Sequence, residues 1–431
     1  MPAATDVVIV GGGLAGLAAA RRLHRAGTPW LLVESADRLG GRIGTDAVDG
    51  YLIDRGFQVV NTGYPRLSAL ADLASLGLGY FTQGVLVRRG GALHRLVHPA
   101  RDPLGAARTV LTDLTDSGVG RRTDGGVGQA GSGLGRLGDR LRLAALAARC
   151  AGYPVDRLLA APETSTETAL RRAGLSDRIV EELVRPFLSG VFGERELATS
   201  SRVAALIVRS FVRGRLGLPA AGIGAVPAAV AAPLPESLIA LGVAATSVRP
   251  GQVSSTAGPV RCRAVLVGTD PATAATLLPS LGRVRMHTLT TYYHSTAEPP
   301  LDEPILLLDG DRRELVANTV VVSHAAPTYA PAGRHLVATS VAGPMVPPEP
   351  VVRAELARLY GRPVDDWAHL TTVTVPAALP AAPPPQGRLR KPVVLGDGMF
   401  VAGDHRASPS VQGALSSGWR AAGAVLEYLG R

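Results

Sequence analysis

The chain has 431 residues, 46% hydrophobic but only 4% aromatic, so a large core must be built mainly from Leu, Val and Ala. The formal net charge of +10 comes from scattered arginines, with Lys391 the single lysine, and no nucleic-acid recognition motif accompanies it, which excludes a dedicated nucleic-acid-binding protein. Two distant cysteines, Cys150 and Cys262, exclude a cysteine zinc site and favour a reduced, cytoplasmic protein; we expect no metal. No signal peptide or uncharged apolar run of about 18 residues is recognised, so we expect no membrane span.

The first predicted unit is a buried strand followed by a glycine turn and a helix. The β-branched run Asp6–Val10 predicts the strand, and "GGGLAG" then satisfies G-x-G-x-x-G. Gly11 permits the tight turn, Gly13 lets the backbone approach a diphosphate, and Gly16 lets the helix pack closely on the strand. The helix begins with Leu14 and Ala15, and its free N–H groups and positive dipole end face the phosphates.

A second strand, "WLLVE", ends in an acid at Glu34, about 20 residues after the glycines. A carboxylate in this place takes the ribose hydroxyls of an adenosine, and Ser35 beside it belongs to the same predicted site. Strand, helix, strand and acid in this order predict a dinucleotide-binding unit, and Glu34 argues against a 2′-phosphate because two negative charges would meet.

"ESADRLGGR" then places Gly41 and Arg42 just beyond the acid. This wording resembles the signature of the flavin amine oxidase, protoporphyrinogen oxidase and phytoene desaturase superfamily. The resemblance implies FAD as cofactor, with this loop over its diphosphate and the planar guanidinium compensating phosphate charge. It also implies that Gly56, Phe57 and Gln58 pass the flavin face. Gln58 is a candidate catalytic residue, with a solvent-facing strand residue as the equal alternative.

The middle of the chain is predicted to build a substrate-binding part and to return once to the nucleotide part. Residues 86–214 show helical periodicity, and the Gly-rich stretch 115–139 predicts a disordered insertion. The Arg-rich apolar helices favour core packing over contact with a membrane surface. In residues 215–278 the resemblance maps a backbone contact with the adenine to Val248.

Residues 279–395 predict the strands of a mainly antiparallel sheet, followed by a Pro-rich connection over Val375–Val394. Tyr292 is a candidate pocket wall or catalytic residue, with core packing an equal alternative. Relatives that oxidise amines keep a lysine in this region, where the chain has His287 or Thr288. This departure argues against a simple amine oxidase that uses O2 efficiently.

The C-terminal segment "MFVAGDHRASPSVQGALSSG" predicts a strand, a Gly-Asp turn and a helix capped by Ser410. The resemblance implies that Asp404 accepts hydrogen bonds from the ribityl chain or lies beside the diphosphate. It also implies that the amides of Val411 and Gln412 point at the flavin C2 carbonyl, where a helix dipole favours negative charge. His405 is a candidate proton carrier, and a loop histidine with a structural hydrogen bond is the favoured alternative.

Together these patterns predict an α/β fold: a three-layer, Rossmann-like FAD-binding domain with an inserted α+β substrate-binding domain. The predicted segments of the FAD-binding domain are 1–85, 215–278 and 396–431, and those of the substrate domain are 86–214 and 279–395. The predicted function is FAD-dependent hydride removal from a C–N or C–C bond of a small apolar or amphipathic metabolite, with O2 or another electron acceptor. The alternatives are a redox-neutral FAD isomerase, an NAD-only dehydrogenase and a binding protein with a vestigial flavin site. We expect a cytoplasmic monomer or homodimer, with membrane association as the alternative.

Overall fold

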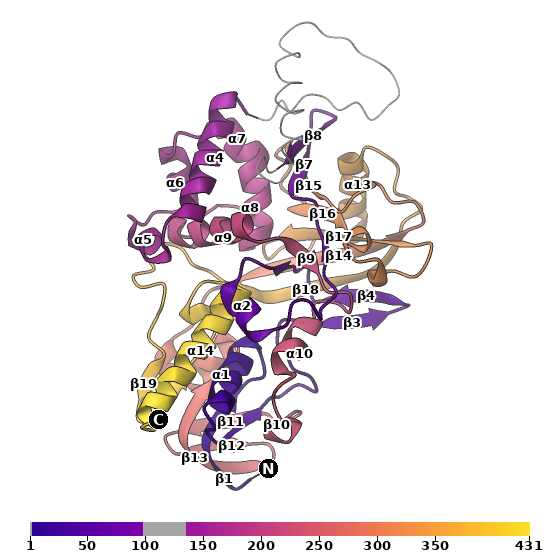
Figure 1. The fold of residues 1–431 in the computed structure, drawn as a ribbon. Coiled ribbons are helices and arrows are strands. Elements are labelled where there is room, and N and C mark those ends of the chain that lie inside the picture. The colour runs from indigo at the N-terminus through magenta and orange to yellow at the C-terminus, as the bar shows by residue number, and fades with distance from the viewer. Residues whose placement is uncertain (1, 98–134) are drawn as a thin grey trace, which may run out of the picture.

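The computed structural model describes residues 2–97 and 135–431, and two large sheets dominate it (Figure 1). The first sheet draws its strands from both ends and the middle of the chain. Their order is β10 (Ile239–Ala240), β2 (Trp30–Val33), β1 (Ala4–Val10), β13 (Gly258–Val267), β12 (Gln252–Ser255) and β11 (Ala245–Arg249). The end of β13 also pairs with β20 (Met399–Val401), which pairs with β19 (Val394–Gly396).

The central strands of this sheet are parallel and buried on both faces, as their continuous apolar runs require. Helices α1 (Leu14–Arg25) and α14 (Val411–Tyr428) cover one face, together with α10 (Ala225–Ala231). The β11–β12 hairpin and α11 (Pro271–Leu277) cover the other face. This three-layer arrangement confirms the predicted α/β fold class.

The two ends of the chain meet in the helical layer, where α1 and α14 lie side by side (Figure 1). A Cβ at Gly418 of α14 would lie 1.9 Å from the carbonyl oxygen of Ala15 in α1. The helices approach this closely because a glycine stands at the crossing.

The second sheet is mainly antiparallel. Its order is β18 (Ala368–Pro380), β14 (Met286–Thr296), β17 (His335–Ala342), β16 (Asn318–Val321), β15 (Leu306–Asp309), β7 (Gly84–Arg89) and β8 (Ala92–Val97). Helix α13 (Glu349–Tyr360) packs on one face. Smaller sheets connect the two large ones: β3 (Thr45–Val48) with β4 (Tyr51–Asp54), and β5 (Val60–Asn61) with β9 (Leu216–Leu218) and β6 (Gly79–Tyr80).

A layer of helices packs against the other face of the second sheet. Its members are α4 (Leu137–Gly152), α5 (Val155–Ala160), α6 (Thr166–Arg172), α7 (Asp177–Ile179), a π-helical turn (Val180–Val184), α8 (Arg185–Phe192) and α9 (Ser201–Arg213). The remaining helices are α2 (Pro65–Leu70) and α12 (Val322–Ala325).

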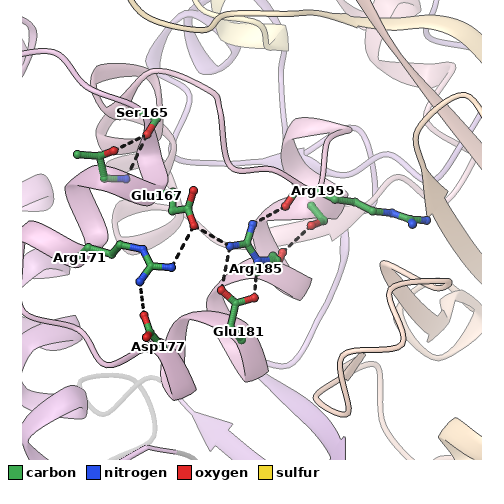
Figure 2. Close-up of polar contacts among 9 residues, drawn as sticks. Ser165, Glu167, Arg171, Asp177, Glu181, Arg185 and Arg195 are labelled. Atoms are coloured by element: carbon green, nitrogen blue, oxygen red, sulfur yellow. Dashed lines mark hydrogen bonds and ion pairs between the residues drawn. The ribbon is translucent and has the colours of Figure 1, made fainter.

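Arginines and carboxylates alternate between these helices (Figure 2). The Arg185 guanidinium donates to both carboxylate oxygens of Glu181, at 2.7 and 2.9 Å, and to Glu167 at 3.2 Å. Arg171 links Glu167 to Asp177. We call these five residues the paired arginine network, because each positive charge in it has a carboxylate partner.

Two expectations about irregular segments need correction. The predicted disordered insertion 115–139 lies outside the described residues up to 134, but its last residues are ordered, because α4 begins at Leu137. Asp139 there accepts hydrogen bonds from the Ser176 amide and hydroxyl. The predicted connection from Val375 begins later than expected, because β18 pairs with β14 as far as Pro380.

No helix within the described ranges is long and apolar enough to cross a membrane. Among residues 2–97 and 135–431, no three His, Cys, Asp or Glu side chains are grouped to hold a metal ion.

Candidate functional site

At the glycine turn after β1, the main chain of α1 and of β2 lies in close contact with the turn. A Cβ at Gly16 would lie 1.9 Å from the carbonyl oxygen of Gly11, so only glycine fits where α1 crosses the strand end. Gly11 itself has φ of +102° and donates its amide to the carbonyl of Val33 at 2.8 Å. At Gly13, the N-cap of α1, a Cβ would meet no atom within 4 Å.

The open space above Gly13 adjoins the start of α1, where Leu14 and Ala15 are the first helical residues. The first amides of a helix have no intrahelical acceptor, and Gly13 offers no side-chain cap. Unpaired donors beside a space that a side chain would fill are what an anionic diphosphate requires. These residues therefore fit the diphosphate of a dinucleotide.

Glu34 closes the glycine turn from the end of β2. One carboxylate oxygen accepts the Gly12 amide at 2.6 Å. The other accepts the Ala36 amide at 2.8 Å and the Ser35 hydroxyl at 3.2 Å. A carboxylate has about four acceptor positions, so capacity for ribose hydroxyls remains after these three bonds.

The Gly-Gly-Arg loop lies against the glycine turn. Gly40 donates its amide to the Gly12 carbonyl at 3.0 Å, and a Cβ at Gly41 would lie 3.6 Å from the Cα of Gly13. Gly41 has φ of +59°, which a residue with a side chain rarely adopts. The loop therefore borders the same open space as Gly13.

Arg42 connects this loop to both the C-terminal segment and the second sheet. Its guanidinium forms an ion pair with Asp404 at 2.8 Å and donates to the Ala378 carbonyl in β18 at 2.8 Å. Burial acts to lower the pKa of Arg42, but the charge of Asp404 and the hydrogen bond to it outweigh burial and raise it. Residues 42 and 404, predicted separately from opposite ends of the chain, are thus in direct contact.

His405 lies beside this ion pair and is 5% exposed. Both nitrogens of its ring are buried without a hydrogen-bond partner in the protein. Burial lowers the pKa of His405 to about 4, although the charge of Asp404 opposes the shift. The imidazole is therefore neutral at pH 7, with one donor and one acceptor position unused by the described residues.

Helix α14 begins at Val411, where Ser410 caps it by accepting the Gly413 amide at 3.1 Å. The Gln412 side chain is already engaged: it accepts the Arg66 amide at 2.9 Å and donates to the Ser416 hydroxyl at 3.0 Å. One N–H of the Gln412 side chain and its main-chain amide remain to meet a cofactor.

A hollow of about 260 Å³, which includes space open to solvent, lies at the start of α14, between the loop after Arg42 and the segment that follows β4. Its lining includes Ile43, Gln58, Val60, Ile223 and Val411. It joins the two stretches that the family resemblance placed at the flavin.

Gln58 is held by its amide group, which donates to the Arg42 carbonyl at 3.1 Å and to the Arg55 carbonyl at 2.9 Å. Only its carbonyl oxygen remains to meet a ligand, so Gln58 can act there as an acceptor and not as a donor. Gly56, with φ of +83°, and Phe57 lie against β14, where the Phe57 amide donates to the Thr291 hydroxyl at 3.1 Å.

The sequence matches the family described as flavin containing amine oxidoreductase over residues 14–426. The chain belongs to this family. Membership confirms the suspected resemblance, the oxidoreductase class and the FAD cofactor.

Curated relatives of this flavoprotein match over limited stretches. Coproporphyrinogen III oxidase of Bacillus subtilis is 30% identical over 43% of the chain, and putrescine oxidase of Kocuria rosea is 45% identical over 17%. The alignments span only 36% and 15% of those two proteins. The solved structure of cyclohexylamine oxidase from Brevibacterium oxydans has a TM-score of 0.70 at 19% identity, covering 99% of this chain and all of that one, which shows a common fold.

One predicted site residue of this flavin oxidoreductase lies apart from the others. Tyr292 is 1% exposed in the core beneath α13, and its hydroxyl donates to the Pro347 carbonyl. Val248, in β11, packs against the apolar cluster that contains Val10 and Val33, so its predicted contact with the adenine stays a prediction. In the segment just before β11, the Val243 amide donates to the Glu34 carbonyl at 2.8 Å.

The sequence patterns did not identify Asp54 as a site residue, although its carboxylate joins four segments. It accepts hydrogen bonds from the Thr45 hydroxyl at 2.6 Å, the Ile223 amide at 3.0 Å and the Tyr329 hydroxyl at 2.7 Å. Its main-chain carbonyl accepts the Tyr293 hydroxyl at 2.9 Å. We call these five residues the Asp54 junction; an acid within the apolar strand "YLID" was the only signal for it.

At the place where the family resemblance implies a lysine, the chain has His287 or Thr288. The hydroxyl of Thr288 donates to the Pro376 carbonyl at 2.9 Å. The Nε2 atom of His287 lies 3.9 Å from a carboxylate oxygen of Glu194, and burial lowers the pKa of His287. Lys391 is half-buried near Arg406, and burial together with that charge lowers its pKa.

Proposed function

We propose that this flavoprotein removes a hydride from a C–N or C–C bond of a small apolar or amphipathic metabolite. The observation that carries the proposal is the ion pair between Arg42 and Asp404, 2.8 Å long, which joins the two ends of the chain beside the open space at Gly13. When bound, FAD supplies the hydride acceptor. The named relatives act, by their names, on a porphyrinogen and on an amine, so both bond types stay within the proposal.

The chain's own groups have distinct parts in this proposal. The glycine turn, Glu34 and the Gly-Gly-Arg loop hold the nucleotide end. The 260 Å³ hollow at the start of α14 takes the reacting end, where Gln58 faces the ligand only as an acceptor. His405, neutral and without a partner, is proposed to hydrogen-bond the cofactor or a bound water rather than to carry charge.

The domain division belongs to the same proposal. Membership in the first sheet supports 1–85, 215–278 and 396–431 as the FAD-binding segments, and the second sheet supports 86–214 and 279–395 as the substrate-binding segments. Strand β19 extends the last FAD-binding segment back to Val394. We further propose a small-molecule substrate, a cytoplasmic location and a monomer or homodimer.

The first experiment tests whether the open space at Gly13 is needed to bind the diphosphate or is needed by the fold. Gly13→Ala adds a methyl group that meets no protein atom within 4 Å, so thermal stability of the apoprotein should not change, whereas FAD content should fall at least about tenfold. Gly152→Ala, at the end of α4 and equally unobstructed, is the control and should retain FAD. Full FAD content in the Gly13 variant would overturn the placement of the diphosphate.

The second experiment tests the reaction. The purified protein is mixed anaerobically with amines, prenyl compounds and porphyrinogens, and the flavin absorbance is followed. Bleaching with stoichiometric oxidation of the substrate supports the proposal, whereas isomerisation of the substrate without net oxidation would identify the redox-neutral alternative. A yellow protein that no compound bleaches would favour a vestigial flavin site.

A further inference from the structure

Three arginines surround one indole on the outer side of α1 and α14. The guanidinium carbons of Arg22, Arg25 and Arg66 lie 5.4, 5.6 and 4.8 Å from the ring centroid of Trp419. Arg22 also donates to the Trp419 carbonyl at 2.8 Å, and Gly423 leaves room for it, since a Cβ there would lie 2.4 Å from the guanidinium. We call these three arginines and Trp419 the arginine patch.

No carboxylate balances this charge within the described residues. The guanidinium groups of Arg25 and Arg66 make no hydrogen bond or ion pair with any residue the structure describes. Burial and the charge of Arg22 lower the pKa of Arg66, and burial and the charge of Arg25 lower that of the neighbouring Arg21. Like charges therefore repel one another here, unlike those of the paired arginine network (Figure 2).

The patch lies close to the proposed position of the flavin. Trp419 follows Val411 by eight residues on α14, which at a rise of 1.5 Å per residue is about 12 Å along the helix. Arg66 is nearer still, because its amide is bonded to the side chain of Gln412 at 2.9 Å. Electrons leaving a flavin at this end of α14 would have a short path through packed protein to the surface.

We propose that the arginine patch is the docking surface for an acidic one-electron carrier protein that reoxidises the flavin. Two electrons leave the reduced cofactor, one to each of two carrier molecules, and its two protons pass to water. The proposal rests on the proposed function only for the source of the electrons. An acidic carrier would supply the negative charge that the arginine patch lacks among the described residues. Arg and Trp are also among the residues that most often dominate the binding energy of interfaces.

Other partners fit the patch less well. The large apolar side chains that are most exposed within the described residues include none of its neighbours on α1 or α2, so nothing there would insert into a lipid surface. The one nearby, Tyr428, is nine residues beyond Trp419 on α14. A single indole with three guanidinium groups matches a compact acidic protein surface.

The test uses the FAD-loaded protein and two haem proteins of opposite charge, acidic cytochrome b5 and basic cytochrome c. The flavin is photoreduced, so no substrate is needed, and haem reduction is followed by stopped-flow absorbance. We expect faster reduction of cytochrome b5 at low ionic strength and loss of that advantage in high salt. Binding of fully oxidised cytochrome b5, measured by calorimetry, should show the same salt dependence without any electron transfer.

The decisive variant is Arg25→Glu with Arg66→Glu, because each guanidinium would lose only its contact with the Trp419 ring and no hydrogen bond or ion pair with a described residue. Its rate and affinity with cytochrome b5 should fall on the order of tenfold or more, while cytochrome c reacts faster. Arg249→Glu with Arg261→Glu makes the same charge change on the exposed surface of β11 and β13 and should have little effect. The single variant Arg25→Gln, at an exposed site, serves if the double variant does not fold.

Equal losses in both double variants would overturn the proposal, because net charge and not the patch would then set the rate. A wild-type protein that does not prefer cytochrome b5 would overturn it too. If a substrate bleaches the flavin but the protein does not discriminate between the two cytochromes, only the docking proposal is refuted. A protein that takes up no FAD refutes the proposed function as well.

Discussion

The glycine turn at the head of α1 and the Asp54 junction both join segments distant in the chain, but they do so by opposite means. At the glycine turn, main chain packs on main chain: Gly16 on Gly11, Gly40 on Gly12, and Gly418 on Ala15. At the Asp54 junction, the Thr45 and Tyr329 hydroxyls and the Ile223 amide donate to one buried carboxylate. The Tyr293 hydroxyl donates to the main-chain carbonyl of the same residue. The first region depends on the absence of side chains, and the second depends on their presence.

This difference predicts different consequences of mutation. A Cβ at Gly11 or Gly16 meets backbone, which cannot rotate away, so damage there is geometric and independent of pH. The junction holds a titratable group that is 3% exposed, so its contribution to stability changes with pH. The four predictions below test this contrast, from the largest effect to the smallest.

Gly16→Val should have the largest effect. Its Cβ would overlap the Gly11 oxygen at 1.9 Å, and Gly11 cannot retreat because a Cβ there would already be 3.0 Å from the Thr269 nitrogen. We expect the free energy of unfolding to fall by more than about 3 kcal/mol, which is the upper end of the usual cost of overpacking a core. We also expect that no FAD is retained. Denaturant unfolding and flavin absorbance measure both. Near-normal stability and colour would contradict the close packing.

Arg42→Ala removes the cation that connects the Gly-Gly-Arg loop to Asp404 and to β18. It leaves Asp404, whose side chain is 6% exposed, without its partner, so the free energy of unfolding should fall by about 4 kcal/mol and FAD content should fall with it. Arg38→Ala breaks the more exposed pair with Asp46 and should cost less than about 1 kcal/mol. Similar losses in the two variants would mean that Asp404 is solvated.

Asp54→Asn tests the pH dependence of stability that is predicted for the Asp54 junction. Burial raises the pKa of Asp54 from 3.8 to about 6, although its three hydrogen bonds oppose the shift. The folded state therefore binds the extra proton, so this contribution to stability is full below about pH 4 and is lost as pH rises through 6. The difference in unfolding free energy between wild type and variant should shrink by about 3 kcal/mol from pH 4 to pH 7.

Urea unfolding at pH 4, 5, 6 and 7 measures this change. Asp366→Asn, at an exposed position, provides the control and should give a difference that does not vary with pH. Parallel curves for wild type and Asp54→Asn would show that the carboxyl titrates normally in the folded protein.

Tyr292→Phe should have the smallest effect. The variant loses the hydrogen bond to the Pro347 carbonyl in the core beneath α13, which costs about 1 to 2 kcal/mol of unfolding free energy. FAD content and the rate of anaerobic bleaching should not change. A bleaching rate reduced more than about tenfold would restore Tyr292 as a catalytic candidate.

Local patterns were sufficient where one short segment contains the whole constraint. The order of strand, G-x-G-x-x-G, helix, strand and Glu34 predicts its own geometry, because Gly16 must pack on Gly11 five residues before it and Glu34 accepts the Gly12 amide. The Gly-Asp turn and Ser410 cap at the C-terminus followed the same logic. The role of Tyr292 was not resolved in this way, and the role of Val248 stays a prediction. Alternation along a strand does not say which face meets a cofactor, and a strand's position in the sheet depends on its neighbours.

The sequence by itself determined the fold class and the glycine turn between β1 and α1, because the conformational freedom of glycine and the apolar runs of parallel strands act over a few residues. Only the tertiary structure decided that Arg42 pairs with Asp404, that Asp54 joins four segments, and that three arginines meet at Trp419. Each of these contacts joins side chains from separate segments, and whether a charge is paired, buried or left without a partner depends on what the fold places beside it.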